Sequence, residues 1–318
     1  MSIIFIGTPA FAVPSLQRLA AAGHDIAAVI TQPDRPAGRG RHKRPSAVKE
    51  AALKLGLAVL QPESLRDPAA VNQVRALAPE CAVAVAYGQI LRPEFLAVPT
   101  RGVVNVHPSL LPKYRGASPI PAAILAGDEL TGVTIMLMDA GMDSGPILAQ
   151  STHPVDPEDT AGTLSERLAA FGADLLAKTL PRWLHNDIEP HPQDPAQATT
   201  TSLLRKEDGA IDWTRPAPEI WRRVRAYNPW PGAHTRLQTE LLHIWQAWPV
   251  DAPSRAQPGT VVTLAPEESA MVPDTPPFAV QTGDGLLAVR EAQRAGRRAL
   301  PAAEFLRGMP ALVGERLE

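Results

Sequence analysis

The chain has 318 residues, of which 45% are hydrophobic and 20% are charged. This length predicts about two domains, and this composition can build a sizeable core, which excludes wholesale disorder. The 31 basic and 33 acidic residues give a formal charge of -2, which excludes a uniformly basic nucleic-acid-binding surface but leaves room for a local basic patch.

Cysteine content and apolar runs restrict the class further. Cys81 is the only cysteine, so the chain can form neither an intrachain disulfide nor a cysteine-rich zinc site. No apolar run approaches the roughly 20 residues that a membrane helix needs. The first apolar run has no basic leader before it and fits a first strand better than a signal peptide. We therefore expect a cytoplasmic protein with no membrane segment.

The first half of the chain alternates short apolar runs with helical patterns. The runs are nearly continuous and rich in β-forming residues, as in strands covered on both faces. They occupy residues 3–6, 26–30, 81–86, 103–106 and 134–138. Between the first two, residues 13–22 predict a helix, with Pro14 suited to its first turn and Gly23 to its end. This order predicts an α/β domain over residues 1–185, with a doubly wound, mostly parallel, Rossmann-like sheet.

A long helical pattern and a proline-rich stretch follow. Residues 161–184 place Leu164, Leu168 and Phe171 on one helical face. Residues 186–205 are mostly polar and contain several prolines. Such a stretch is typical of a linker between domains.

After the linker the pattern changes to one helix and several short strands. Residues 218–227 predict the helix. The strand-like runs occupy residues 241–245, 260–264, 278–281 and 286–289. Turn signals such as Gly283-Asp284-Gly285 separate them. Short strands with regular turns indicate a small β-barrel, so we predict an OB-like C-terminal domain over residues 206–318 that binds nucleic acid.

The strongest signal for chemistry lies in residues 103–112. Asn105 and His107 are two positions apart on a predicted strand, so their side chains share a face. They come near the carboxyl end of that strand, where doubly wound sheets bind ligands. An amide beside an imidazole suits a developing oxyanion, which indicates acyl transfer. From spacing alone, a turn cap at Asn105 and a core histidine at His107 explain the pattern equally well.

A second candidate group follows residues 134–138, in a loop with two glycines and two acids. Asp143 can orient or charge-stabilise His107 and pass protons through water. Its alternative role is a hydrogen bond to the local backbone, which is common in such turns. Asp139 ends the strand and is the second choice for the acid.

A basic segment lies between positions 35 and 49 and contains no acid. Its cations are Arg35, Arg39, Arg41, Lys43, Arg44 and Lys49. Beside the catalytic edge of the sheet, such a segment can neutralise phosphates, an interaction that weakens steeply with salt. Taken alone, a charge run is more often simply solvated. A further basic cluster, at Arg222, Arg223 and Arg225, is either a nucleic-acid contact or an exposed helix face.

Together these segments resemble the methionyl-tRNA formyltransferases, a branch of the folate-dependent formyltransferase family. The similarity covers nearly the whole chain, in the right order. The motifs that carry it are Gly7-Thr8-Pro9, Gln32-Pro33-Asp34-Arg35-Pro36-Ala37-Gly38-Arg39-Gly40, Ala86-Tyr87-Gly88, Asn105-Val106-His107, Ser109-Leu110-Leu111-Pro112, Gly141-Met142-Asp143-Ser144-Gly145, Ile211-Asp212-Trp213 and Asn228-Pro229-Trp230-Pro231.

The resemblance implies transfer of the formyl group of 10-formyltetrahydrofolate to the α-amine of methionine on charged initiator tRNA, a step in translation initiation. It implies that Asn105 donates to the formyl oxygen, that His107 helps to stabilise the tetrahedral intermediate, and that Asp143 supports His107 and the proton transfers. It implies a folate site lined by Tyr87, Gly88, Ser109, Leu110, Leu111 and Pro112. It implies tRNA contacts from Arg39, Arg41, Lys43 and Arg44. No metal is implied, and we expect a monomer.

Two positions depart from the family pattern. Ala10 stands where an acidic residue is usual, and Pro108 replaces a small residue.

Three other functions fit part of the sequence. A nicotinamide dehydrogenase would need Gly-x-Gly-x-x-Gly, which residues 7–12 lack. A formyltransferase acting on glycinamide ribonucleotide or an amino-sugar nucleotide would keep the three polar residues but would not need both basic segment and barrel. A non-catalytic RNA-binding protein leaves those three residues unexplained.

Overall fold

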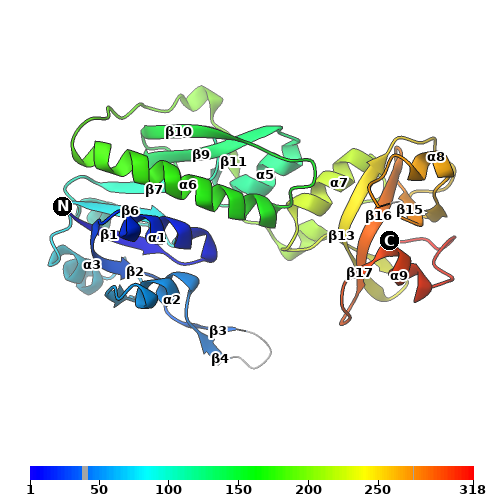
Figure 1. Cartoon of the computed structure of the whole chain (residues 1–318), viewed down its shortest axis with the longest axis horizontal. Coiled ribbons are helices and arrows are strands. Elements are labelled where there is room, and N and C mark those ends of the chain that lie inside the picture. Colours follow the sequence, from blue (N-terminus) through cyan, green and yellow to red (C-terminus); the bar gives the residue numbers. More distant parts are fainter. Residues whose placement is uncertain (38–41, 275) are drawn as a thin grey trace. The chain divides into compact units, whose positions relative to one another are not determined.

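The computed structural model describes residues 1–37, 42–274 and 276–318 (Figure 1). The chain divides into two compact units. The first unit comprises residues 1–119, 130–154 and 165–201, and the second comprises residues 120–129, 155–164 and 202–318. The domain boundaries predicted at residues 185 and 205 stay predictions.

A seven-stranded sheet forms the centre of the first unit. Its strands are β1 (Ser2–Gly7), β2 (Asp25–Ile30), β5 (Val59–Leu60), β6 (Cys81–Val85), β7 (Val103–His107), β9 (Leu130–Leu137) and β10 (Ile147–Pro154). The spatial order is β10-β9-β7-β6-β1-β2-β5. The five strands from β7 to β5 run parallel, whereas β9 is antiparallel to β7 and to β10. The predicted doubly wound, mostly parallel α/β sheet is confirmed.

Helices cover both faces of this sheet. They are α1 (Val13–Ala21), α2 (Ala47–Lys54), α3 (Pro68–Arg75), α4 (Pro93–Leu96) and α6 (Ala161–Leu184). The remaining helix of this part of the chain, α5 (Pro119–Ala126), belongs mostly to the second unit. Ile4 and Ile6 pack with Val71 of α3 and Phe95 of α4 in one buried cluster. On the opposite face α1 and α6 cross the sheet (Figure 1). The near-continuous apolar strands follow from this two-sided burial.

The helix starts show which local signals the sequence supplies. Ser46 caps α2 by accepting from the backbone N–H of Lys49 at 3.0 Å, and Asp67 caps α3 in the same way. Ala10 lies exposed in the short 3-10 turn η1 (Ala10–Ala12), which has no acidic residue in its first turn. The position where the family usually has an acid is therefore a surface position.

The second unit contains an antiparallel half-barrel. Its strands are β12 (His234–Leu237), β13 (Glu240–Val250), β14 (Val261–Thr263), β15 (Phe278–Gln281), β16 (Leu286–Arg294) and β17 (Leu300–Pro301). Its helices are α7 (Ala217–Ala226), α8 (Pro266–Ser269) and α9 (Ala302–Arg307), after the 3-10 turn η3 (Lys206–Gly209). The strand order is β12-β13-β16-β15-β14, with β17 beside β16. Ile220 and Val224 of α7 pack into the same core as Ile244 of β13. The predicted β-architecture of the C-terminal part is confirmed.

The proline-rich stretch before the second unit belongs to the first unit up to residue 201. It contains the 3-10 turn η2 (Pro195–Gln197) and the two-residue strand β11 (Thr200–Thr201), which pairs in parallel with β8 (Arg115–Gly116). In the part of the chain that the structure describes, no helix is both long and apolar enough to cross a membrane.

Candidate active site

Strand β7 places Asn105 and His107 on one face of the sheet. His107 ends the strand and is 4% exposed, and Asn105 is half-buried. Their register partners on β9 are Met136 and Thr134. The backbone of Asn105 also pairs with Ala84 of β6, whereas the pairing of His107 is with β9 alone. The alternation of the strand therefore places Asn105 and His107 on the same face of the sheet, while their catalytic roles stay predictions.

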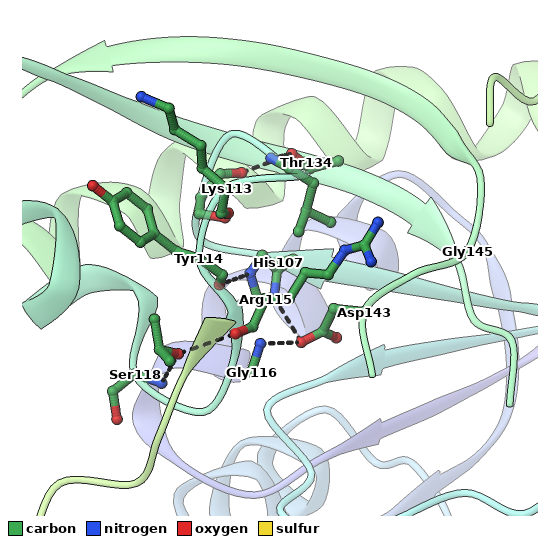
Figure 2. Close-up of polar contacts among 12 residues, drawn as sticks. His107, Lys113, Tyr114, Arg115, Gly116, Ser118, Thr134, Asp143 and Gly145 are labelled. Atoms are coloured by element: carbon green, nitrogen blue, oxygen red, sulfur yellow. Dashed lines mark hydrogen bonds and ion pairs between the residues drawn. The ribbon is translucent and has the colours of Figure 1, made fainter. Parts of the chain in front are cut away.

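The two nitrogens of His107 have different partners (Figure 2). Nε2 lies 3.0 Å from the backbone carbonyl oxygen of Tyr114. Because a carbonyl oxygen only accepts, we infer that Nε2 carries the hydrogen of the neutral ring. Nδ1 faces the Asp143 carboxylate, with 3.6 Å between Nδ1 and Oδ2. The imidazole can therefore take up a proton at Nδ1 beside a negative charge.

Asp143 reaches this position from the loop between β9 and β10. Its backbone has φ +51°, in the left-handed region, and its Oδ2 accepts a hydrogen bond from the backbone N–H of Gly116 at 2.8 Å. Asp139 instead accepts from the N–H of Gly141 and the hydroxyl of Ser144, so it closes the local turn. Of the two acids, the structure brings Asp143 to His107.

Burial sets the charge of the histidine. Loss of hydration lowers the pKa of His107 below its usual value of 6.5, and the Asp143 carboxylate and the Tyr114 carbonyl only partly oppose this effect. At neutral pH the ring is therefore uncharged. A neutral ring close to an ionisable partner can accept a proton during a reaction and return it afterwards.

The turn after His107 is held by its own polar groups. The backbone N–H of Ser109 donates to the His107 carbonyl at 3.0 Å, with Pro108 between them. The fully buried Ser109 hydroxyl donates to the carbonyl of Lys113 at 2.7 Å. The backbone N–H of Leu111 donates to the Thr134 hydroxyl. These bonds fix the turn that carries the predicted folate contacts at Ser109, Leu110, Leu111 and Pro112, which stay predictions.

Tyr87 and Gly88 follow β6, the neighbour of β7. The Tyr87 carbonyl accepts from the Thr8 hydroxyl and from Nε2 of Gln32, at 2.9 and 2.8 Å. The Tyr87 phenol oxygen is buried with no hydrogen-bond partner among the described residues, and burial raises the pKa of Tyr87 to about 12. Gly88 has φ +82°, and a Cβ there would lie 2.7 Å from Nε2 of Gln32. Only glycine fits this turn without strain.

Within the basic segment, β3 (Arg35–Ala37) pairs antiparallel with β4 (His42–Arg44), and we call these two paired strands the β3–β4 hairpin. Lys43 and Arg44 are exposed on β4. Arg39 and Arg41, also predicted to contact tRNA, lie outside the described residues. Lys49, the last cation of the segment, pairs with the Asp34 carboxylate, with 2.7 Å between its Nζ and Oδ2.

The arginines of α7 behave differently from one another. Arg225 fits neither sequence interpretation, since it is only 8% exposed. Its guanidinium donates to the carbonyls of Asp159 and Asp156, both at 2.8 Å, and lies 4.4 Å from the ring centroid of Trp221. Arg223 approaches Glu219 at 3.7 Å. Arg225 is therefore a packing residue of the second unit and not part of a free basic surface.

Known proteins match this chain along its whole length. A formyl transferase family model matches residues 1–180, and a model of the formyl transferase C-terminal domain matches residues 203–310. A methionyl-tRNA formyltransferase of Roseiflexus sp. (strain RS-1) is 52% identical, over 100% of this chain and 95% of that protein. The chain belongs to the methionyl-tRNA formyltransferase family. A family member from Chloroflexus aurantiacus (strain ATCC 29366 / DSM 635 / J-10-fl) is 49% identical, over 98% of both chains.

Solved structures of more distant proteins share the fold of this formyltransferase. HypX from Aquifex aeolicus in complex with tetrahydrofolic acid superposes with a TM-score of 0.65 at 17% identity, over 98% of this chain and 48% of that chain. An N-formyltransferase from Helicobacter canadensis gives a TM-score of 0.63 at 19% identity, over 92% and 98% of the two chains.

Several groups that contact the candidate site residues are not indicated by the sequence. They are the Tyr114 carbonyl and the Gly116 N–H, which contact His107 and Asp143, and the side chains of Gln193 and Thr199. The first two are backbone atoms, which residue type does not reveal. The other two lie in the proline-rich stretch that resembles a linker. Among the described residues no group of three His, Cys, Asp or Glu side chains is arranged to hold a metal ion.

Proposed function

We propose that this protein transfers the formyl group of 10-formyltetrahydrofolate to the α-amine of methionine on charged initiator tRNA, as a cytoplasmic monomer, with Asn105, His107 and Asp143 as its catalytic residues. The observation that carries this proposal is the contact of His107 with Asp143, on the face of β7 that also holds Asn105. It occurs in a chain that matches methionyl-tRNA formyltransferases from end to end.

The charges that develop in the reaction require such a site. Attack of a neutral amine on the formyl carbon places negative charge on the formyl oxygen and positive charge on the amine nitrogen. The Asn105 carboxamide supplies a neutral donor for the oxygen. A donor that is already fixed by the strand costs little reorganisation when the charge appears. Asn105 therefore acts on the oxygen side of the reacting carbon.

His107 and Asp143 act as one unit on the proton side. The Nε2 hydrogen of His107 is committed to the Tyr114 carbonyl, so Nδ1 is the atom that takes up a proton. The resulting imidazolium is stabilised by the Asp143 carboxylate and adds positive charge beside the oxyanion. The proton comes from the attacking amine, by way of water and the Asp143 carboxylate, which the Gly116 N–H holds in place. When the tetrahedral intermediate collapses, the bond between the formyl carbon and the folate nitrogen breaks, the proton goes to that nitrogen, and His107 returns to its neutral form.

The residues around the site fit a reduced folate. Tyr87 follows β6, the strand next to β7, and its phenol oxygen is buried with no partner among the described residues. A pterin ring has donors and acceptors that would satisfy such a group. Leu110, half-buried after His107, offers an apolar wall. When bound, the folate supplies the activated formyl group, and these residues hold it against Asn105.

A formyltransferase for a small amine is the second candidate. The fold alone favours it equally, since the neighbour from Helicobacter canadensis, solved with folinic acid and dTDP-3-aminofucose, shares the fold. The exposed cations of the β3–β4 hairpin favour the tRNA substrate, because a small amine does not need a phosphate-binding arm.

Competition between acceptors tests the proposal. Wild-type protein is given labelled 10-formyltetrahydrofolate with equal concentrations of charged initiator tRNA and glycinamide ribonucleotide. We expect label on the tRNA, at a kcat/KM at least about 10³-fold above that for glycinamide ribonucleotide, because site-specific contacts give discrimination of this order. Preferential formylation of the ribonucleotide would support the second candidate.

The hairpin predicts a salt effect. Changing Lys43 and Arg44 together to alanine is expected to reduce the slope of log affinity for tRNA against log salt by about one unit for each phosphate that the two side chains neutralise. Lys178→Ala, an exposed cation on α6, is the matched control and should keep the wild-type slope. The measurement is tRNA binding by fluorescence titration across salt concentrations. Equal slopes in all three proteins would exclude a phosphate contact at β4.

A further inference from the structure

The segment that leads from the first unit to the second lies against both loops of the candidate site. We define residues 191–201 as the strap. Its first residue, His191, exchanges two backbone hydrogen bonds with Ile147, at 2.8 and 2.9 Å. Its last two residues form β11, which pairs with β8. The strap is therefore fixed at both ends to the unit that carries Asn105, His107 and Asp143.

Gln193 uses its whole side-chain amide to join the two loops. Its Nε2 donates to the backbone carbonyls of Asp143 and Gly145, both at 2.8 Å. Its Oε1 accepts from Nε and Nη2 of Arg115, at 3.0 and 2.8 Å. A glutamine amide has two donor hydrogens and two acceptor lone pairs, so this set satisfies it fully. Gln193 thus links the loop of Asp143 to β8.

The loop of Asp143 needs such support because of its backbone. Asp143 has φ +51°, a conformation that non-glycine residues keep only where the surroundings hold it. Two positions later, a Cβ at Gly145 would lie 1.9 Å from the Leu137 carbonyl oxygen, so the loop passes directly over the end of β9. Gln193 bonds the carbonyls of these two residues, on either side of Ser144. Its removal frees the peptide that orients the Asp143 side chain.

The strap also holds the other partner of the histidine. The Thr199 hydroxyl accepts from the backbone N–H of Tyr114 at 2.8 Å, and the Thr199 carbonyl accepts from the N–H of Arg115 at 2.8 Å. Tyr114 has φ +62°, and its carbonyl is the acceptor for Nε2 of His107. Both groups that contact the imidazole are therefore anchored to one short segment.

We infer that Gln193 is a positioning residue for formyl transfer, which holds the Asp143 carboxylate in contact with His107. This inference rests on the proposed function. The contact is 3.6 Å long, so a displacement of about 1 Å removes much of its effect, and misplacements of this size cost up to about 10²-fold in rate. The charged groups that the strap holds near the histidine are Asp143 and Arg115, and Asp143 is the one that raises the pKa of His107.

The test replaces Gln193 by methionine, which keeps the length of the side chain and removes its hydrogen bonds. We expect kcat for formyl transfer to fall by about 10- to 10²-fold, with KM for folate and for tRNA within about twofold of wild type. The acid limb of the pH profile of kcat/KM should move to lower pH, because His107 loses the nearby negative charge. Gln197→Ala is the matched control, since Gln197 lies in the strap and, among the described residues, its side chain donates to the Asp194 carboxylate and to neither loop.

A second variant and a second readout complete the test. Gln193→Glu keeps an acceptor for Arg115 but has no donor for the two carbonyls, so kcat should fall as in Gln193→Met. An NMR titration of the His107 ring reports its pKa without turnover, and this pKa should be lower in Gln193→Met than in wild type. The inference would be overturned if the wild type is active and both variants keep the wild-type kcat and the wild-type His107 pKa. An inactive wild type would overturn the proposed function, while the titration would still decide the role of Gln193.

Discussion

Replacing Asn105 by alanine is expected to lower kcat/KM for formyl transfer by about 10²–10³-fold, the usual loss when one oxyanion donor is removed. The Asn105 side chain is half-buried, and the backbone that carries it is fixed by pairing with Ala84 of β6 and Met136 of β9. Its donor is therefore in place before the charge develops. The loss should fall on kcat, since the interaction is strongest in the transition state.

Two comparisons make this prediction specific. Affinity for charged tRNA should be unchanged in Asn105→Ala, because the side chain lies on the sheet and not on the β3–β4 hairpin. Asn72→Ala, at an exposed asparagine of α3, should keep the wild-type rate. The measurement is the initial rate of label transfer to charged initiator tRNA. A wild-type rate in Asn105→Ala would refute its catalytic assignment.

Replacing Asp143 by asparagine is expected to lower kcat by about 10²–10⁴-fold, the range for a positioned acid–base group. Asparagine keeps an oxygen that accepts from the Gly116 N–H, so the loop should retain its shape. What disappears is the negative charge 3.6 Å from Nδ1 of His107 and the acceptor for the amine proton. The rate change therefore measures the charge and not the fold.

The pH profile gives the sign of this effect. In wild type, burial lowers the pKa of His107 below 6.5 while Asp143 partly raises it. Without the carboxylate the pKa falls further, because nothing at that position favours the charged ring. The acid limb of kcat/KM, which reports the free enzyme, should move to lower pH in Asp143→Asn. A limb that stays in place would show that the carboxylate does not act through the histidine.

The parts of the fold that the sequence predicted are those with uninterrupted local patterns. The helix over residues 161–184 and the strand over residues 278–281 have the predicted bounds, because each is a regular apolar pattern that ends at a change of composition. β13 and β16 extend five residues beyond their predicted ends. The extensions contain Pro249 and Glu291, residue types that local propensity does not favour in strands. Pairing between the two long strands overrides that propensity.

The candidate site also contains residues that local sequence patterns predict and residues that they do not. Asn105 and His107 were predicted because strand alternation alone places them together. Asp143 was predicted as their acid, and its contact with His107 depends on a loop whose positive φ no propensity indicates. The role proposed for Gln193 could not be predicted from the sequence. Its hydrogen bonds go to two backbone carbonyls 50 and 48 positions away, and residue type does not indicate such contacts. Prolines around it made the strap look like an unattached linker.

The most direct test of the account is a double-mutant cycle on His107 and Asp143. kcat/KM for formyl transfer is measured for wild type, His107→Asn, Asp143→Asn and the double variant. Residues that work as one unit show strongly non-additive losses. We expect the double variant to be within about tenfold of the slower single variant. A loss in the double variant equal to the product of the two single losses would mean that the imidazole and the carboxylate act independently, which would contradict the account.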